Sequence, residues 1–569
     1  MVGTRRGFIA TAAAAAAYGG RAAAATAETT VYSGGPILTM DDAQPRAQAV
    51  AVRDGRILAV GGKDEVLAKA GGGARQVDLG GRALLPGFVD AHGHVSFVGV
   101  QSISANLLAA PDGEGDSIAD LQRLTRAWMK ANRPFVERYK VVLGFGYDDS
   151  QLREQRHPTR KELDEISTDL PVLFIHQSGH LGAANSAALD AAGVGAATPD
   201  PQGGVFRREA DGKTPNGVME EHAFMAVMGK LLARLDLDAS LKMIAAGVKR
   251  YTQFGYTTCQ DGKSSVAVVK ALQLAGAKGM LSADVVAYPD VLTATAVVTP
   301  PLLGRTYANR LRVGGVKLSI DGSPQGKTAW LSQPYFVPPE GQNAAYAGYP
   351  AVPVDQCLAA IDKAYANNWQ ILVHANGDAA VDVLIAGVRA AVKKHGGGDR
   401  RTVLIHGQTT REDQVDALKE LGIIPSFFPM HTFYWGDWHR DSVLGPARAE
   451  NISPTGWALR RGMIFTSHHD APVVNPDSMR VLSATVIRRT RSGDILGPHQ
   501  RVPVEVALKA MTLWPAYQHF EETTKGSITA GKLADFAVLS GDPTAIDPEK
   551  LASLKVTETI KEGVSIWRG

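Results

Sequence analysis

Two histidines separated by one residue follow the first strongly apolar segment of the chain. Asp90-Ala91-His92-Gly93-His94 comes directly after Leu84-Leu85-Pro86-Gly87-Phe88-Val89. Because residues two apart on a strand point the same way, we expect Asp90, His92 and His94 to share one face. Two imidazoles placed in this way reach one divalent ion at about 2.0–2.1 Å. Surface strands carry His-x-His pairs by chance, so the weight of this pair depends on the rest of the chain.

Three more residues of types that bind metals end apolar runs later in the chain. They are His374, His406 and Asp470. Each one alone is as readily a hydrogen-bonded residue at the end of a strand. Together with the His-x-His pair they place imidazole and carboxylate groups after four separate apolar runs. This arrangement predicts a metal centre with nitrogen and oxygen ligands.

The segments that carry these residues alternate with helical patterns. Short apolar runs separated by helical periodicity are typical of βα units and a parallel sheet. Eight such units favour a closed (β/α)8 TIM barrel, whose active site lies at the carboxyl ends of its strands. We predict the eight strands at Phe88–His94, Thr257–Asp261, Ala283–Tyr288, Val316–Asp321, Ile371–Ala375, Val403–Gly407, Ile424–Phe428 and Ile464–Asp470.

The two ends of the chain carry β patterns in place of βα units. Residues 28–85 contain a hairpin signal at Asp54-Gly55, and residues 526–569 carry matching β segments. We predict that both ends form one small β-sandwich domain and that residues 86–525 form the barrel. The long separation of the first two predicted strands indicates an insertion at about residues 104–250, and such insertions overhang the carboxyl-end face.

Composition excludes several kinds of partner and site. The chain has 569 residues and a net charge of +3, which argues against nucleic acid as a partner. Its two cysteines, Cys259 and Cys357, cannot form a disulfide framework or the usual thiolate metal site. A buried free thiol at Cys259 is favoured, and a single bridge between the two is the alternative.

The first 27 residues form a pattern of their own. Thr4-Arg5-Arg6-Gly7-Phe8-Ile9 precedes an Ala-rich stretch that ends at Ala25-Thr26-Ala27. This resembles a twin-arginine signal peptide with cleavage after Ala27. We therefore expect recognition by the twin-arginine export machinery and a periplasmic or secreted protein; an Ala-rich tail with a chance arginine pair is the alternative. The apolar stretch is too short for a stable membrane span.

The whole pattern resembles the amidohydrolase superfamily. Pro86-Gly87-Phe88-Val89-Asp90-x-His92-x-His94, His374, His406 and Asp470 carry that resemblance, which covers nearly the whole chain after residue 27. More narrowly, the chain is similar to the type-3 branch, the group that contains N-substituted formamide deformylases. The local features are Gly144–Asp149, His157–Arg160, Gly179-His180 with Asn185-Ser186, Asn216–Glu221, Lys317–Ser323 and His374–Asp378.

The resemblance implies a role for each ligand candidate. His92 and His94 would bind one metal, and His374 and His406 would bind a second metal or help to hold the first. Asp470 would contact metal and accept the proton of the attacking water. Lys317 matches a lysine that is N-carboxylated and bridges two metals in many members; an uncarboxylated lysine with a single metal is the alternative. The implied cofactor is one or two divalent ions, with zinc expected.

Five residues are candidates near the substrate. His180 and His431 are candidates for contact with the developing oxyanion, and Glu221 for an extra ligand or substrate contact, although satisfied loop residues are the alternative. His468 shares the strand parity of Asp470, which favours a substrate contact. The aromatic run that ends at Trp435 predicts an apolar pocket wall, with core packing as the alternative.

Two segments depart from the family pattern. The end of the eighth predicted strand reads Ser467-His468-His469-Asp470-Ala471-Pro472, where Ser-Asp or Gly-Ser-Asp before Ala-Pro is usual. The run Ser323–Lys327 differs from the Gly-rich run usual after Asp-Gly-Ser, which affects the substrate contacts more than the chemistry.

These observations predict a metal-dependent hydrolase that cleaves a C–N bond of amide or formamide type in a small molecule, using a metal-activated water. Ester or lactone hydrolysis, deamination and isomerisation use the same ligands, so the sequence does not separate them. A non-catalytic exported binding protein on the same fold is a further alternative, and the complete ligand set argues against it. The sequence leaves the formation of a homo-oligomer open.

Overall fold

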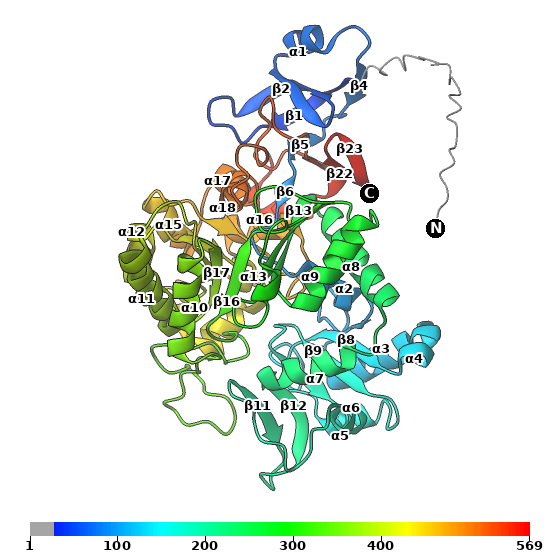
Figure 1. The fold of residues 1–569 in the computed structure, drawn as a ribbon, viewed down its shortest axis with the longest axis vertical. Helices are drawn as coiled ribbons and strands as arrows, with labels where there is room; N and C mark the ends of the chain where they lie inside the picture. Colours follow the sequence, from blue (N-terminus) through cyan, green and yellow to red (C-terminus); the bar gives the residue numbers. More distant parts are fainter. Residues whose placement is uncertain (1–27) are drawn as a thin grey trace, which may run out of the picture.

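A sheet made from both chain ends, a body of parallel strands with helices, and an inserted unit follow one another along the long axis (Figure 1). The computed structural model describes residues 28–569, and the predicted signal peptide lies outside them. Within the described part of the chain, no helix has the length and apolarity needed to cross a membrane.

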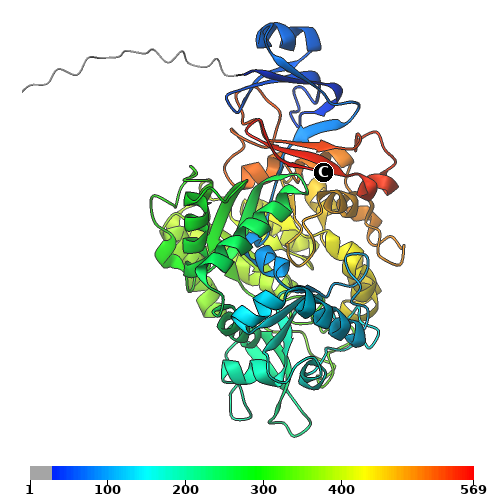
Figure 2. The ribbon, with the colours of Figure 1, turned by 90° about the vertical axis from the view of Figure 1, so that its right-hand side faces the viewer.

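The sheet of the chain ends joins segments that are far apart in sequence. Its strands run in the order β23-β22-β21-β5-β1-β2-β3, and β4 pairs with β1. The antiparallel pair of β5 and β21, with Pro86 opposite Phe536, connects the two ends (Figure 2). The predicted hairpin at Asp54-Gly55 connects β2 to β3. The strands are β1 (Thr30–Leu38), β2 (Arg46–Arg53), β3 (Arg56–Gly61), β4 (Arg75–Asp78), β5 (Ala83–Pro86), β21 (Phe536–Leu539), β22 (Val556–Lys561) and β23 (Val564–Arg568).

The body contains two parallel sheets. One has the order β15-β14-β13-β6 and the other β16-β17-β18-β19-β20. Each of the eight predicted strands overlaps an observed one, and β15 (Leu311–Val313) was not predicted. The strands β6 and β20 are shorter than predicted, which changes how the residues after them are placed. The bounds are β6 (Phe88–Val89), β13 (Tyr256–Ser264), β14 (Asp284–Pro289), β16 (Gly315–Ser319), β17 (Gln370–Ala375), β18 (Val403–His406), β19 (Ile424–Phe427) and β20 (Thr466–Ser467).

Helices surround these strands and share one large apolar core with them. Cys259 on β13 and Cys357 in α10 are both buried and free, which confirms the free-thiol prediction for Cys259. The helices nearest the site are α2 (Val95–Ser102), α8 (Leu237–Thr252), α9 (Val266–Ala277), α10 (Val354–Ala366), α11 (Asp378–His395), α12 (Glu412–Glu420), α13 (Met430–Trp438) and α16 (Ser478–Ile487).

The inserted unit between β6 and β13 has a six-stranded sheet in the order β11-β12-β10-β9-β8-β7. One apolar cluster around Phe145 and Phe224 and another around Leu121 and Phe174 give this unit cores of its own. Its elements are β7 (Ala105–Asn106), α3 (Ile118–Ala131), α4 (Arg133–Tyr139), β8 (Val142–Tyr147), β9 (Val172–His176), β10 (Leu181–Ala184), α6 (Ser186–Ala192), β11 (Gly204–Arg208), β12 (Pro215–Glu221) and α7 (His222–Leu232).

Candidate metal centre

The chain turns immediately after β6, and the carboxylate of Asp90 stabilises this turn by accepting backbone hydrogen bonds. Its Oδ1 accepts a hydrogen bond from the backbone N–H of His92 at 3.0 Å, and its Oδ2 accepts one from the N–H of Gln260 at 3.0 Å. An aspartate that binds the backbone two residues on is typical of a turn. Asp90 is therefore occupied by backbone donors and does not line the cavity with the two histidines, in contrast to the shared face expected from strand alternation.

One nitrogen of each histidine in the pair is held by an oxygen. Nδ1 of His92 lies 2.6 Å from Oε1 of Gln260, and Nδ1 of His94 lies 2.7 Å from the carbonyl oxygen of Gly262. These contacts leave Nε2 of the two rings at 3.3 and 3.2 Å from Oδ1 of Asp470. An imidazole whose other nitrogen is held by an oxygen is the usual arrangement of a metal-binding histidine, because that contact fixes its tautomer and orientation.

The ends of β17 and β18 bring two further histidines to the same place. Nε2 of His406 lies 3.1 Å from Nδ1 of His374 and 3.8 Å from Oδ2 of Asp470. The other nitrogen of His406 lies 3.0 Å from Nε2 of His468, whose Nδ1 lies 2.9 Å from the hydroxyl of Ser426. His468 is buried behind His406 and orients it. The expected substrate contact at His468 is therefore wrong for this geometry, since the ring does not line the cavity.

Two ligand candidates have an unusual backbone. The φ angles of His406 and Asp470 are 71° and 53°, in the left-handed region that non-glycine residues rarely adopt. Such conformations persist where the surrounding structure enforces them, and they concentrate at functional sites. His406 is the last residue of β18 and Asp470 lies three residues after β20, so the strained conformation occurs where each chain segment leaves the carboxyl end of its strand.

Lys317 on β16 is buried beside the same group. Its Nζ lies 2.9 Å from Nε2 of His92. Burial lowers the pKa of Lys317 well below its ordinary value. A neutral amine is the form of lysine that reacts with carbon dioxide to give a carbamate, so the environment of Lys317 suits the predicted modification.

The residues fit a divalent metal. His92, His406 and Asp470 each offer one ligand atom, and these atoms lie within 4.8 Å of one another. Burial holds the pKa of His92, His374 and His406 well below the ordinary value, so the rings are neutral, which is the form that binds metals. Oδ1 of Asp470 is buried and accepts no hydrogen bond from the described residues. A buried carboxylate oxygen without a donor is costly unless a cation compensates it.

A cavity of about 490 Å³ opens above these ligands. Its apolar wall comes from α2, α7, α9 and the segment after Asp470, and consists of Phe97, Met225, Met228, Val268, Pro472 and Val473. The predicted aromatic wall is wrong in its location. Trp435 is only 1% exposed, and its indole N–H donates to Oδ2 of Asp148 in the inserted unit at 2.6 Å. Trp435 therefore offers no surface to a molecule in this cavity.

His180 and Glu221 meet at the cavity, whereas His431 lies behind it. Nδ1 of His180 lies 2.7 Å from Oε2 of Glu221, whose Oε1 accepts a hydrogen bond from the Thr328 hydroxyl at 2.8 Å. The His180 ring lines the cavity, so Glu221 orients a cavity residue. His431 is 3% exposed and contacts Nε2 of His439 at 2.9 Å. His431 lines a separate small niche that also includes His180.

Three residues that the sequence did not predict support the ligands. Gln260 holds His92, Ser426 holds His468, and Asp321 lies 3.3 Å from Nε2 of His374 while it accepts the backbone N–H groups of Asn376 and Gly377. Burial raises the pKa of Asp321 to about 7. Asp321 follows β16 by the same alternation as Lys317, which is the one sequence signal that would have identified it.

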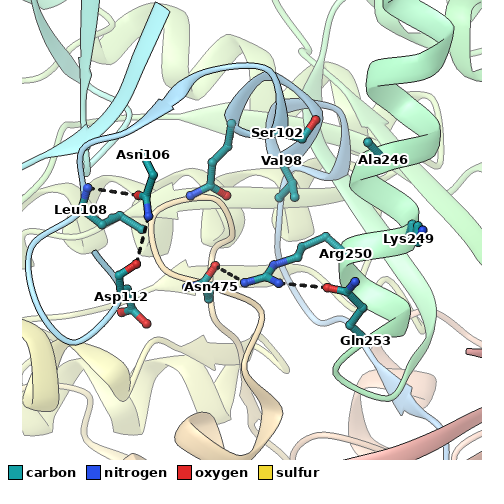
Figure 3. Close-up of a pocket in the computed structure, with 11 residues that line it drawn as sticks. Val98, Ser102, Asn106, Leu108, Asp112, Ala246, Lys249, Arg250, Gln253 and Asn475 are labelled. Atoms are coloured by element: carbon teal, nitrogen blue, oxygen red, sulfur yellow. Dashed lines mark hydrogen bonds between the residues drawn. The ribbon is translucent and has the colours of Figure 1, made fainter. Parts of the chain in front are cut away.

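A second cavity, of about 420 Å³, lies between α2 and α8. Figure 3 shows the guanidinium of Arg250 within it, hydrogen-bonded to Asn475 at 3.1 Å and to Gln253 at 2.9 Å. None of the residues that line this cavity is a histidine. It is therefore separate from the candidate metal centre.

Comparison with known proteins agrees with this geometry. The type-3 profile of the amidohydrolase family matches residues 75–566. YtcJ of Bacillus subtilis is 27% identical over 94% of this chain and 99% of its own length. The N-substituted formamide deformylase of Arthrobacter pascens is 28% identical over 93% of this chain and 96% of its own length.

The fold is shared with a solved structure. A metal-dependent hydrolase from Pyrococcus horikoshii superposes with a TM-score of 0.72 and 22% identity, over 92% of this chain and 99% of that one. The body thus has a TIM-barrel-like α/β fold. With the family match over most of its length and the metal-ligand candidates gathered at the carboxyl ends of its strands, the chain belongs to the type-3 branch of the amidohydrolase family and is a metal-dependent amidohydrolase.

Proposed function

We propose that this enzyme hydrolyses the C–N bond of an N-substituted formamide, or of a closely related amide, that carries an apolar or aromatic group on nitrogen. The observation that carries the proposal is the position of Asp470 and the histidines at the base of a cavity with an apolar wall. Burying an alkyl or aryl group against Phe97, Met225 and Met228 stabilises binding by about 1.5–3 kcal/mol. The likeness to a formamide deformylase over nearly the whole chain supports the same substrate class.

His92, His94, His374, His406 and Asp470 would hold the metal. When bound, a divalent ion lowers the pKa of water and polarises a carbonyl group. Asp470 accepts the proton of the attacking water through its free Oδ1 and returns that proton to the departing nitrogen. One C–O bond forms, the C–N bond breaks, and the products are a carboxylic acid and an amine. His180, oriented by Glu221, is placed to donate a hydrogen bond to the carbonyl oxygen.

The test is a substrate panel with the purified protein. N-benzylformamide, N-butylformamide, phenyl acetate and a lactone are compared in the wild type and in His92→Ala/His94→Ala, with metal content measured by elemental analysis. The proposal expects bound metal and formamide turnover, with both reduced in the variant. Bound metal with turnover of esters alone would reassign the reaction. Metal without turnover of any substrate would favour the binding-protein alternative.

The finer features of the site belong to the same proposal. We propose zinc as the metal and a carbamate on Lys317 that bridges two ions. The burial of Lys317, which lowers the pKa of its amine, supports this proposal. About two zinc equivalents per chain, falling to about one in Lys317→Ala, is the expected result. One equivalent in both proteins would contradict the bridging role.

The parallel strands are proposed to close into one barrel. A parallel bridge between Asp290 and Lys317 joins the ends of the two sheets on one side. On the other side the N–H of Asp470 donates to the carbonyl oxygen of His92 at 3.2 Å. We also propose closure of the terminal sheet into a sandwich. A crystal structure with an open sheet in either place would contradict the corresponding part.

Export of the enzyme by the twin-arginine machinery also remains a proposal, and it rests on the sequence of residues 1–27. Cell fractionation of the wild type and of an Arg5→Lys/Arg6→Lys variant tests it. Periplasmic enzyme in the wild type alone is the expected result, and equal cytoplasmic retention of both would contradict it.

A further inference from the structure

One buried glutamine separates the active site from another cavity. The niche behind the metal ligands has a volume of about 10 Å³, room for about one water molecule, and is lined by Asp470, His180 and Gln325 among others. A further cavity of about 240 Å³ is also lined by Gln325. The Gln325 side chain is 3% exposed. A single side chain therefore stands between the reacting groups and a larger space.

This further cavity lies between the inserted unit and the body. Asp149, His157 and Arg207 line it from the inserted unit, whereas Lys327 and Trp438 line it from the body. The lining also includes three exposed residues, Gln155, Arg156 and Glu340. The cavity therefore has a route to solvent that does not pass the metal centre. We call it the rear cavity.

The rear cavity contains a cation with no carboxylate partner. Lys327 is 8% exposed, and its Nζ donates to the carbonyl oxygen of Val337 and the hydroxyl of Ser442, both at 2.8 Å. Among residues 28–569 no carboxylate lies within ion-pair distance of this ammonium; Asp149, which lines the same cavity, contacts His176 at 3.0 Å. Burial lowers the pKa of Lys327 to about 8, so the group is still mostly charged at neutral pH. The charge of Asp149 and the ring of Trp438, 4.7 Å from Nζ, act on Lys327 without forming an ion pair. A buried ammonium with no ion-pair partner is expensive, which favours an anion in this cavity.

The niche itself lacks partners for its polar groups. The Oγ of Ser323, Oε1 of Gln325 and Oδ1 of Asn376 all line it, and none has a hydrogen-bond partner among the described residues. Buried polar atoms are normally satisfied by protein or by water. A small guest that both donates and accepts hydrogen bonds, such as water or a small protonated acid, would satisfy these atoms, whereas a larger group would not fit. Ser323 to Lys327 is also one of the two segments in which the sequence departs from the family pattern described above.

We propose that the rear cavity binds and releases the small carboxylate product, and that Gln325 is the gate between it and the active site. This inference rests on the proposed function, in which the acid product is formate or another very small acid. The two products then separate by size and charge. The substituted amine leaves through the cavity above the metal ligands, whose wall is apolar. The carboxylate moves past Gln325 toward Lys327.

Binding of formate tests the site independently of turnover. Saturation-transfer NMR of sodium formate, with sodium chloride as the ionic-strength control, is applied to the metal-loaded wild type, Lys327→Met, Lys327→Arg and Lys263→Met. Lys263 lines the cavity of about 490 Å³ above the metal ligands, which we call the front cavity, so its variant reports formate held there. We expect Lys327→Met to weaken binding about tenfold, the effect of one charge-assisted hydrogen bond, while the other two bind like the wild type. Unchanged binding in Lys327→Met would overturn the site, and a loss confined to Lys263→Met would place the anion in the front cavity.

Kinetics of Gln325→Leu tests the gate. The leucine is of similar size but cannot hydrogen-bond a carboxylate. With N-benzylformamide we expect a burst of one amine equivalent followed by a steady-state rate reduced about tenfold, because release of the acid becomes limiting. A slower burst with no change in release, or an unchanged steady-state rate, would exclude the gate. If no amide is turned over but formate still requires Lys327, the proposed function fails and the anion site stands.

Discussion

Two groups of buried ionisable residues lie at different ends of the parallel strands. They differ in whether residues of this chain supply the opposite charge. Near the start of β14, Lys525 lies 2.8 Å from Asp284, Lys561 lies 2.7 Å from Asp284, and Arg312 lies 2.6 Å from Glu521. We call these five residues the ionic cluster. Each member has an opposite charge from within the chain. The cluster also links the terminal sheet to the body, since Lys561 belongs to β22.

Most residues of the metal centre are also buried, but none of its carboxylates is paired in this way with a charged lysine or arginine from the described part of the chain. Burial holds the pKa of His92, His374 and His406 well below the ordinary value and also lowers that of Lys317, and Oδ1 of Asp470 has no hydrogen-bond donor among the described residues. Burial alone therefore does not distinguish a structural site from a catalytic one. The distinguishing property is whether the chain itself supplies the counter-charges, because a site that lacks them is completed only by a ligand.

Replacing Asp470 by asparagine should have the largest effect of any single change. The amide keeps the shape of the side chain but cannot accept the proton, so kcat should fall by about 10²–10⁴-fold. The melting temperature and most of the metal should be retained. Steady-state kinetics on N-benzylformamide and elemental analysis measure both. Activity near that of the wild type would remove Asp470 from its role as the base.

Replacing Lys525 by methionine should lower the free energy of unfolding and leave the activity unchanged. It leaves the carboxylate of Asp284 with one cation fewer in a buried position, at a cost of about 3–5 kcal/mol in the free energy of unfolding. Urea unfolding measures this cost, and kcat of the folded fraction should be unchanged. Lys69→Met is the matched control, because Lys69 and Glu65 form a solvent-exposed pair that contributes little to stability. Equal effects of the two variants would show that burial of the pair is irrelevant.

Much of the metal centre was predictable because carboxyl ends of parallel strands converge. His374 and His406 were identified from residue type and strand position, and Lys317 from the family resemblance; the structure brings all three together with His92 and Asp470. The partners that hold the ligands were not predictable. Gln260 reaches His92 only through the register between neighbouring segments, and nothing in a single glutamine indicates such a contact.

The fold was also predictable only where the sequence carries a pattern. Apolar runs mark buried strands well, so all eight predicted segments overlap a strand, whereas the three residues of β15 are too few to form a pattern. Asp90 was misplaced because β6 ends at Val89 and strand alternation does not extend beyond it. The aromatic run was misplaced because aromatic density indicates burial and does not specify what the rings pack against.

The acid stability of the protein should depend on Glu521. Burial raises the pKa of this carboxyl, but Lys525 and Arg312 outweigh burial and lower it from 4.5 to about 2. A lowered folded-state pKa gives stability that is present above pH 4.5 and lost as the pH falls toward about 2. The loss should be on the order of 2–3 kcal/mol. Urea unfolding between these pH values in wild type and Glu521→Gln measures it; parallel pH profiles for the two proteins would contradict the assignment.

The substitution with the smallest expected effect tests whether the substrate contacts the wall at Met228 or the aromatic run at Trp435. Met228 lines the front cavity from α7, whereas Trp435 is buried against Asp148 and lines no part of it. Met228→Ala should therefore raise KM for N-benzylformamide about fivefold without changing kcat, because it removes apolar contact made equally in the ground and transition states. Trp435→Phe removes only the indole N–H donor and should leave KM unchanged. The opposite result, with KM sensitive to Trp435 and not to Met228, would return the substrate to the aromatic run and contradict the cavity as the binding site.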